Sequence, residues 1–264
     1  MGLFSFTQEI AVDLGTANTI ISTDGKIVVD EPSVVALDGA TGKMIAVGEK
    51  AKMMYEKSNS SIKTIRPLKD GVIADFNACE QMIRGLIKMC PRKRRLFSPS
   101  LRMVIGVPSG STEVELRAVR DSAEHAGGRD VYLVFEPMAA AIGIGIDVTQ
   151  PEGNMVVDIG GGTTEIAVIS LGGIVSNNSI KMAGDDLTAD IQEYMSRQHN
   201  VKVSERMAER IKINVGAALT ELGEDAPDDY VVHGPNRISA LPMEVPVCYQ
   251  EVAHCLDKSI SKIE

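Results

Sequence analysis

Apolar and polar residues follow two different periods along this chain, and the alternation of those periods predicts an α/β protein. Short, mostly apolar runs predict strands, namely 9–13, 19–22, 26–29, 33–37, 44–47, 101–107, 131–135, 155–159 and 165–171. Apolar positions spaced by three and four residues predict helices, namely 112–126, 185–198, 204–218 and 249–263. No long linker interrupts the pattern, so we expect lobes that are continuous with one another.

Two helix starts carry a local physical signal. Thr112 followed by Glu115 forms a capping-box pattern, in which each side chain satisfies a backbone N–H group at the start of a helix. Pro137 marks a second helix start, because its missing N–H group costs nothing in the first turn. Glu136 therefore stands between a predicted buried strand and a predicted helix.

The composition restricts the class of partner. The 264 residues carry a net charge of −9, which opposes the positive field expected of a nucleic-acid-binding protein. Trp is absent and aromatic residues make up only 4%, so stacking platforms for single strands are not expected either. The four cysteines show no Cys-x-x-Cys spacing and are interpreted as ordinary packing or surface thiols. No apolar stretch is long enough to span a bilayer and the first six residues lack a secretory signal, which predicts a cytoplasmic protein.

Two segments of the chain repeat one another. Residues 10–21 and 155–166 align without a gap. The alignment places Asp13 on Asp158, Gly15 on Gly160, Asn18 on Thr163 and Thr19 on Thr164. Each copy predicts an apolar strand with an Asp at its end, a tight Gly turn and a second strand.

The residue types of this repeat suit phosphate binding. Glycines let backbone N–H groups approach phosphate oxygens closely, and consecutive N–H groups in such a turn form an anion-binding hollow. Threonine hydroxyls can add donors, and the two aspartates suit a hydrated Mg²⁺ between them. The predicted binding residues are Asp13, Gly15, Thr16, Ala17, Asn18 and Thr19 in the first copy, and Asp158, Gly160, Gly161, Gly162, Thr163 and Thr164 in the second, with Asp13 and Asp158 facing the metal.

The glycines of the chain allow other interpretations. Either loop alone is also compatible with an ordinary Gly-containing hairpin, and it is the repetition that favours phosphate binding. The chain has no Gly-x-x-x-x-Gly-Lys-[Ser/Thr] motif, and Gly143-Ile-Gly145 lacks the third glycine of a dinucleotide fingerprint.

Strings along nearly the whole chain resemble those of one protein superfamily. They are 13–19, 30–35, 66–75, 104–108, 135–141, 158–165 and 209–212. Together they resemble the actin, Hsp70 and sugar-kinase superfamily and, within it, the MreB family of bacterial actin homologues. The resemblance implies an actin-like (ribonuclease H-like) duplicated domain with two lobes around a nucleotide cleft. The lobes would be 1–143, with a small insertion near 31–65, and 144–264, with a small subdomain near 181–245.

The resemblance also implies roles for individual residues. Glu136 matches the residue that positions the attacking water, and Thr163 matches its partner. Gly184 and Asp185 match the ribose-side turn, and the adenosine side is matched by Glu209, Arg210, Ile211 and Lys212. Without the resemblance, Glu136 would be a strand-end residue that caps the next helix, and Glu209 with Lys212 an ordinary i,i+3 surface ion pair. Family members continue beyond Glu264 with a further Gly-rich turn beside the adenosine, and we expect a complete site to need that segment.

A basic segment predicts contact with a membrane. Four cations at 92–95 precede Leu96 and Phe97, and basic residues favour anionic head groups while the apolar pair inserts beside them. The pattern alone slightly favours a solvated charge run with two packed residues, but the resemblance implies membrane contact by an apolar pair in this loop. Leu3, Phe4 and Phe6 are a second candidate.

The function implied by the resemblance is that of an ATP-binding cytoskeletal protein. It would form membrane-associated filaments on the inner face of the cell membrane, hydrolyse ATP slowly with Mg²⁺, and direct cell-wall synthesis and rod cell shape. Its partners would be other copies of itself and transmembrane cell-shape and cell-wall synthesis proteins. The alternative is a sugar-type small-molecule kinase on the same fold, although no polar cluster suggests its carboxylate base. An Hsp70-like chaperone would need more than 264 residues.

Overall fold

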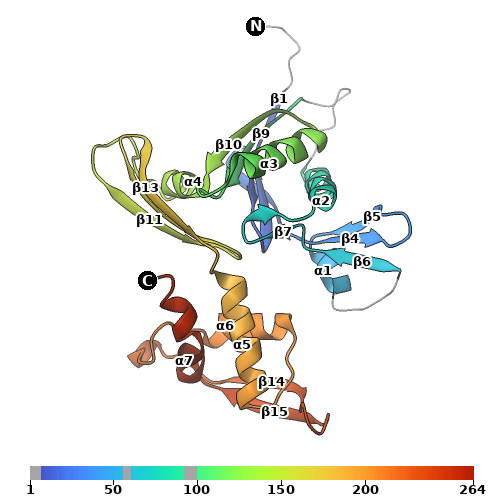
Figure 1. The fold of residues 1–264 in the computed structure, drawn as a ribbon, viewed down its shortest axis with the longest axis vertical. Helices are drawn as coiled ribbons and strands as arrows, with labels where there is room; N and C mark the ends of the chain where they lie inside the picture. The colour runs from blue at the N-terminus through green and yellow to red at the C-terminus, as the bar shows by residue number, and fades with distance from the viewer. Residues whose placement is uncertain (1–6, 56–60, 92–99) are drawn as a thin grey trace. The chain divides into compact units, whose positions relative to one another are not determined.

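The computed structural model describes residues 7–55, 61–91 and 100–264, and it has the predicted α/β character. The chain forms two compact units, one up to Lys181 (unit 1) and one from Met182 to Glu264 (unit 2), and each is described by itself (Figure 1). The predicted division into lobes after residue 143, with small subdomains near 31–65 and 181–245, stays a prediction. In the described part of the chain, no helix combines the length and apolar character needed to cross a membrane.

Unit 1 contains a five-stranded sheet in the order β10-β9-β1-β2-β3. Its strands are β1 (Thr7–Leu14), β2 (Asn18–Thr23), β3 (Lys26–Pro32), β9 (Ser100–Val107) and β10 (Gly128–Phe135). The first three form an antiparallel meander, and β9 and β10 run parallel to β1. Parallel neighbours need a crossover connection, and helix α3 (Glu113–His125) supplies it between β9 and β10. The five strands predicted from short apolar runs all fall within these bounds.

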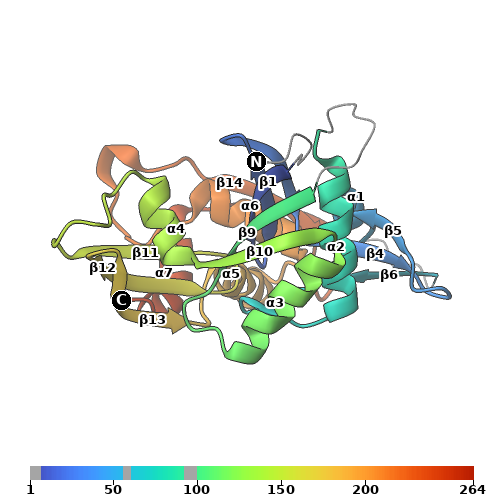
Figure 2. The same cartoon turned by 90° about the horizontal axis from the view of Figure 1, so that it is seen from above.

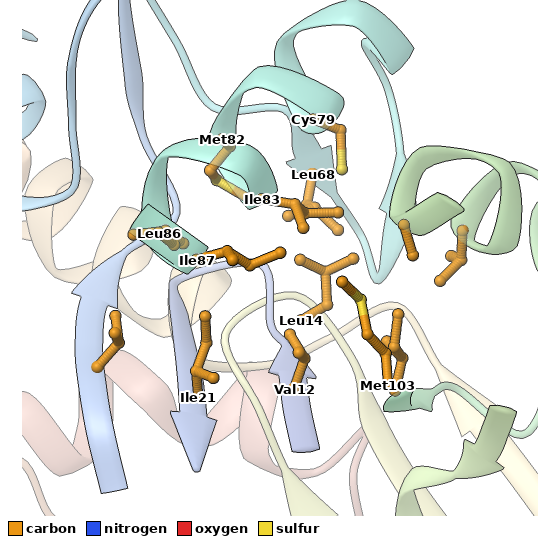
Figure 3. Close-up of a cluster of buried hydrophobic side chains, with 14 of the residues drawn as sticks. Val12, Leu14, Ile21, Leu68, Cys79, Met82, Ile83, Leu86, Ile87 and Met103 are labelled. Carbon is orange, nitrogen blue, oxygen red and sulfur yellow. The ribbon is translucent and has the colours of Figure 1, made fainter. Parts of the chain in front are cut away.

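One face of this sheet carries the main core of unit 1. On β1 every second residue is buried, as the period of a half-buried strand requires: Ile10, Val12 and Leu14. Helix α2 (Phe76–Met89) packs onto these strands with fully buried side chains such as Met82 and Leu86 (Figure 3). Burying one aliphatic side chain contributes about 2 kcal/mol, so this face holds the sheet firmly. The ends of β1 and β10, where Asp13 and Glu136 lie, thereby rest on a rigid support.

The helices begin where their caps predict. Thr112 caps α3 in the expected capping box: its backbone N–H donates to Glu115 Oε2 at 2.7 Å, and its hydroxyl accepts from the backbone N–H of Glu115 at 3.3 Å. Asp75 caps α2 by accepting from the backbone N–H of Ala78 at 2.9 Å. Helix α4 (Glu136–Gly143) has Pro137 in its first turn, as predicted.

A second sheet repeats the meander of the first. Its strands are β11 (Asn154–Ile159), β12 (Thr164–Ser170) and β13 (Gly173–Ile180), all antiparallel, and α4 packs against β11 and β12 (Figure 2). The register confirms the gapless alignment of the two segments, because Leu14 pairs with Thr19 and Ile159 pairs with Thr164.

The repeat extends to a third strand that was not predicted. β13 follows a turn at Leu171 and Gly172 with φ of 52° and 75°, and β3 follows a turn at Asp24 and Gly25 with φ of 51° and 71°. Both are the kind of turn that matches the twist of a hairpin. The polar run of Ser and Asn within β13 hides its strand character from a pattern based on apolar residues.

Two small additions complete unit 1. A three-stranded sheet consists of β4 (Val35–Asp38), β5 (Met44–Val47) and β6 (Ile62–Ile65), with helix α1 (Glu49–Tyr55) beside it. A short hairpin consists of β7 (Leu68–Lys69) and β8 (Val72–Ile73), and it turns at Asp70 and Gly71 with φ of 50° and 76°. Only β4 and β5 among these elements were predicted.

Unit 2 packs helices against a hairpin. Its elements are α5 (Gly184–Gln198), α6 (Glu205–Val215), a 3-10 turn (Gly223–Asp225), β14 (Tyr230–Pro235), β15 (Pro242–Val247) and α7 (Tyr249–Ile260). Its core includes Ile191, Met195, Ile211, Val232 and Val247. Helix α6 ends at Val215, before the predicted residue 218, because the backbone of Gly216 is extended. Helix α7 likewise ends at Ile260 rather than at residue 263.

Candidate functional site

The two repeated loops lie against one another in unit 1. The first joins β1 to β2, and the second joins β11 to β12. A Cβ on Gly161 would lie 2.7 Å from Ala17 Cβ, and a Cβ on Gly162 would lie 2.7 Å from Thr16 Oγ1. Real Cβ atoms do not approach other atoms so closely, so the loops meet at this distance because both positions are glycine. The structure thus brings the predicted phosphate-binding residues of both copies to one place.

The turn between β7 and β8 contacts both of these loops. The backbone N–H of Gly71 donates to Thr16 Oγ1 at 3.1 Å, and a Cβ on Gly71 would lie 2.8 Å from Thr163 Cγ2. A Cβ on Gly162 would lie 3.1 Å from Asp70 Cα. Sequence reasoning used residues 66–75 only for the resemblance and did not assign them to the site. The Asp-Gly pair, a strong hairpin signal, was the feature that could have identified the turn.

Ser33 stabilises the first loop by hydrogen bonds to its backbone. Its hydroxyl donates to the Gly15 carbonyl at 2.6 Å, and its backbone N–H donates to the Ala17 carbonyl at 2.9 Å. Since that hydroxyl has one proton, the 2.8 Å bond between Thr19 Oγ1 and Ser33 Oγ is donated by Thr19. Thr19 was predicted to donate to phosphate, but in this conformation its fully buried hydroxyl braces the loop. Thr164, its counterpart in the second copy, is fully buried as well.

A Ser33→Ala variant is expected to unfold at a lower temperature than the wild-type protein. The change removes two hydrogen bonds and leaves the buried Thr19 hydroxyl without a partner, at a cost of about 1–3 kcal/mol. For a chain of this size the midpoint of thermal unfolding should fall by roughly 2–10 °C. Ser176→Ala, which removes an exposed hydroxyl on β13, is the control and should leave the midpoint unchanged. An unchanged midpoint for Ser33→Ala would show that the brace contributes nothing.

Four carboxylates gather beside the loops: Asp13 at the end of β1, Glu136 after β10, Asp158 on β11 and Glu165 on β12. Glu136 lies over β9, because a Cβ on Gly106 would be 3.4 Å from Glu136 Cγ. Burial is the larger cause that raises the pKa of Glu136 from 4.5 to about 8, and the charges of the other three carboxylates add to it. Near neutral pH this side chain therefore holds a proton until a positive charge arrives.

The two predicted metal-facing aspartates show the same tendency. Burial, followed by the charge of Asp158, raises the pKa of Asp13, although solvent still reaches this residue. Burial, followed by the charge of Glu165, raises the pKa of Asp158. Within residues 7–55, 61–91 and 100–264, no Lys or Arg forms an ion pair with these carboxylates. Among the described residues, no group of three or more His, Cys, Asp or Glu side chains is placed to hold a metal ion directly, so a cation here would be held through water.

The predicted adenosine-side residues lie in unit 2. Lys212 Nζ pairs with Glu209 Oε2 at 2.7 Å and donates to the Gly184 carbonyl at 2.8 Å and to Thr188 Oγ1 at 2.9 Å. The expected i,i+3 ion pair is therefore part of a larger group at the start of α5, in whose first turn Asp185 lies. Thr188 was not predicted.

The remaining predicted residues differ in their positions. Arg210 is exposed on α6. Ile211 is fully buried in the core of unit 2, so any contact of this residue with a ligand would have to come from its backbone. Leu96 and Phe97, and likewise Leu3, Phe4 and Phe6, lie outside the described residues.

Comparisons with known proteins agree with this geometry. The family model described as MreB/Mbl protein matches residues 7–264. The cell shape-determining protein Mbl of Bacillus subtilis (strain 168) is 46% identical over 259 residues, which cover 98% of this chain and 76% of the relative. The crystal structure of MreB5 of Spiroplasma citri bound to AMPPNP matches with a TM-score of 0.86 at 33% identity, and covers 97% of this chain and 76% of that chain. The same protein bound to ADP matches over the same shares with a TM-score of 0.87 at 33% identity.

These matches confirm the actin-like fold, and they favour a cytoskeletal protein over the small-molecule kinase that the sequence left open. The chain belongs to the MreB/Mbl family of actin-like, cell shape-determining proteins.

Proposed function

We propose that this protein binds ATP, assembles into filaments and hydrolyses ATP slowly as the filaments turn over. The observation that carries the proposal is the contact between two Gly loops beside a group of carboxylates. Paired loops offer backbone N–H donors to phosphate oxygens, and the carboxylates suit the cation that accompanies a nucleotide. Family membership supports self-association, and the solved nucleotide complexes of the Spiroplasma relative support a nucleotide ligand.

The proposed chemistry depends mainly on positioning. In phosphoryl transfer the protein contributes orientation and charge stabilisation rather than covalent steps. Glu136 would orient the attacking water, and Thr163, in the second loop, would hold it from the other side. Asp13 and Asp158 would hold Mg²⁺ through water molecules, and that ion supplies positive charge beside the phosphates. The proposed adenosine-side contacts are Gly184, Asp185, Glu209, Arg210, Ile211 and Lys212.

Sedimentation with ATP and with ADP tests the function. We expect the protein to pellet in the presence of Mg²⁺ and ATP above a threshold concentration, and to pellet less with ADP, because filament assembly is proposed to follow the nucleotide state. Titration calorimetry with Mg²⁺-ATP provides the matching measurement of nucleotide binding. A monomer that stays in solution with ATP bound and whose ATP turnover rises on addition of a sugar would contradict the filament proposal and favour the kinase.

We also propose that the filaments lie on the inner face of the cell membrane and contact transmembrane cell-shape and cell-wall synthesis proteins. The support is the basic segment at 92–95 followed by Leu96 and Phe97. Each basic residue near an anionic surface contributes about 1 kcal/mol, and an apolar pair can insert beside it.

A Leu96→Ser, Phe97→Ser double variant is expected to lose most of its binding to anionic vesicles in a flotation assay. The control is Leu171→Ser, which removes an exposed leucine from the turn before β13 and should float like the wild-type protein. Equal flotation of the double variant and the wild-type protein would remove this pair from the proposal and leave Leu3, Phe4 and Phe6 as the candidates.

A further inference from the structure

The two copies of the repeat differ in the residue that faces the shared aspartate across the strands. In the first copy Asp13 pairs with Ile20, whereas in the second copy Asp158 pairs with Glu165. Two carboxylates directly opposite one another repel, and burying a charge without partners is costly. Since the first copy forms the same meander with an isoleucine at this position, the fold alone does not require Glu165.

Glu165 is 1% exposed and is supplied with donors from two directions. Its Oε2 accepts from the backbone N–H of Ser109 at 2.9 Å and from the Ser109 hydroxyl at 2.5 Å. Its Oε1 accepts from the Ser179 hydroxyl at 2.5 Å. Asn177 Nδ2 in turn donates to Ser109 Oγ at 3.1 Å. Three hydrogen bonds converge on this one buried carboxyl group, so the cluster is a firm connection.

The cluster joins the five-stranded sheet of unit 1 to the sheet of β11, β12 and β13. Ser109 lies two residues after the end of β9, and Ser179 lies on β13, where it pairs with Glu165. Gly110 adds a steric condition, because a Cβ there would lie 2.9 Å from Ser179 Cβ. The turn at 108–111 can therefore approach β13 this closely only with glycine at this position.

Each end of this connection lies within a few residues of a part of the candidate site that concerns Glu136 or Thr163. Glu136 rests on Gly106 of β9, three residues before Ser109 in the chain. Thr163 lies two residues before Glu165, in the loop just before β12. Any change in the distance between Ser109 and Glu165 would therefore change the separation of Glu136 and Thr163.

We propose that Glu165 is a positioning residue, which holds the turn after β9 against β12 and β13 and so sets the separation of Glu136 and Thr163. It acts through Ser109 and Ser179 rather than by contact with the nucleotide. The inference rests on the proposed function, in which Glu136 and Thr163 orient the attacking water.

Three variants loosen the connection without removing Glu165 from the core: Ser109→Ala, Ser179→Ala and Gly110→Ala. The matched controls are Ser176→Ala, which removes an exposed hydroxyl from β13, and Gly143→Ala, where an added Cβ would meet no atom within 4 Å. Each loosening variant is expected to lower kcat for ATP about 10-fold and to leave the Kd for Mg²⁺-ATP within about twofold, because misplacement affects the reaction geometry more than ground-state binding. The controls should match the wild-type protein in both.

Glu165→Gln and Glu165→Ala give a further comparison. Glutamine keeps the length of the side chain, accepts from Ser109 through its carbonyl and can donate to Ser179, so it should recover most of the kcat that alanine loses. Hydrogen exchange of the amides at 109–111 and 160–163 in the nucleotide-free protein supplies a readout that needs no activity. Exchange should be faster in all three loosening variants and unchanged in the controls.

The outcomes separate the two proposals. Wild-type exchange rates in the loosening variants, an unchanged kcat, or a parallel loss of kcat and nucleotide affinity would each overturn the positioning role. A wild-type protein without ATP turnover would overturn the proposed function, and the exchange rates would then decide alone whether Glu165 fixes the two loops.

Discussion

A Glu136→Gln variant is expected to hydrolyse ATP about 100-fold more slowly than the wild-type protein, because an oriented carboxylate contributes about this factor to the activation of water. The same variant should be more stable than the wild-type protein without nucleotide at pH 8. The two effects have one cause: the place where Glu136 can orient the attacking water is also one where its negative charge is unfavourable, so activity is gained at the expense of stability. Phosphate release measures the first effect, and thermal unfolding of the nucleotide-free protein measures the second.

The pH dependence follows from the raised pKa of Glu136. Folding raises this pKa from 4.5 to about 8. Between these two values the folded protein keeps a proton that the unfolded chain has released, so the stability of the wild-type protein falls as the pH rises through this window. Below pH 4.5 Glu136 is protonated in both the folded and the unfolded protein, and its contribution to stability is fully retained. Glutamine does not titrate, so the stability of the variant does not fall in this way as the pH rises.

At pH 8 the variant should therefore exceed the wild-type protein by on the order of 2 kcal/mol, after allowance for the partial exposure of Glu136 to solvent. The unfolding midpoint should rise by about 5 °C, and the difference should shrink as the pH is lowered toward 4.5. Glu124→Gln, on the exposed face of α3, is the control and should change neither turnover nor stability. Equal midpoints of Glu136→Gln and the wild-type protein at pH 8 would show that Glu136 is not strained in the folded state.

The phosphate loops could be predicted from the sequence because their signals are local. A strand of period two, an Asp at its end and a Gly turn lie within a dozen residues, and the repetition supplied an internal check that the strand register confirms. The capping box at Thr112 and the helix start at Pro137 were predictable for the same reason. The resemblance then placed Glu136 beside the loops, and the shared rise in the pKa values of the carboxylates is consistent with that placement.

The supports of the site were not predictable, because they depend on residues far apart in the sequence. Ser33 braces Gly15 from the bend just after β3, and Gly71 reaches Thr16 from the hairpin of β7 and β8. The two serines bound to Glu165 come from different sheets. A serine carries no periodic signal, and its role appears only when the sheets are placed side by side.

A Gly161→Ala variant is expected to bind Mg²⁺-ATP about 100-fold more weakly than the wild-type protein. The new Cβ would lie 2.7 Å from Ala17 Cβ and 3.0 Å from the Ala17 backbone nitrogen, and neither atom belongs to a flexible side chain that could move aside. The two loops must therefore separate. Their backbone N–H groups can then no longer donate together to the phosphates of one nucleotide. Losing one or two hydrogen bonds to charged phosphate oxygens, each contributing about 1.5–3 kcal/mol, accounts for this factor.

Gly153→Ala is the matched control. Gly153 lies just before β11, the strand that leads into the loop of Gly161, and a Cβ there would make an ordinary contact, 3.7 Å from Val168 Cγ1. Titration calorimetry gives the Kd of each variant, and thermal unfolding without nucleotide shows whether the fold persists. We expect Gly161→Ala to keep a cooperative transition, because the core under the first sheet does not involve this loop. If Gly161→Ala bound the nucleotide as tightly as Gly153→Ala does, the contact between the loops would not be what holds the phosphates, and the phosphate site would have to be sought elsewhere in the chain.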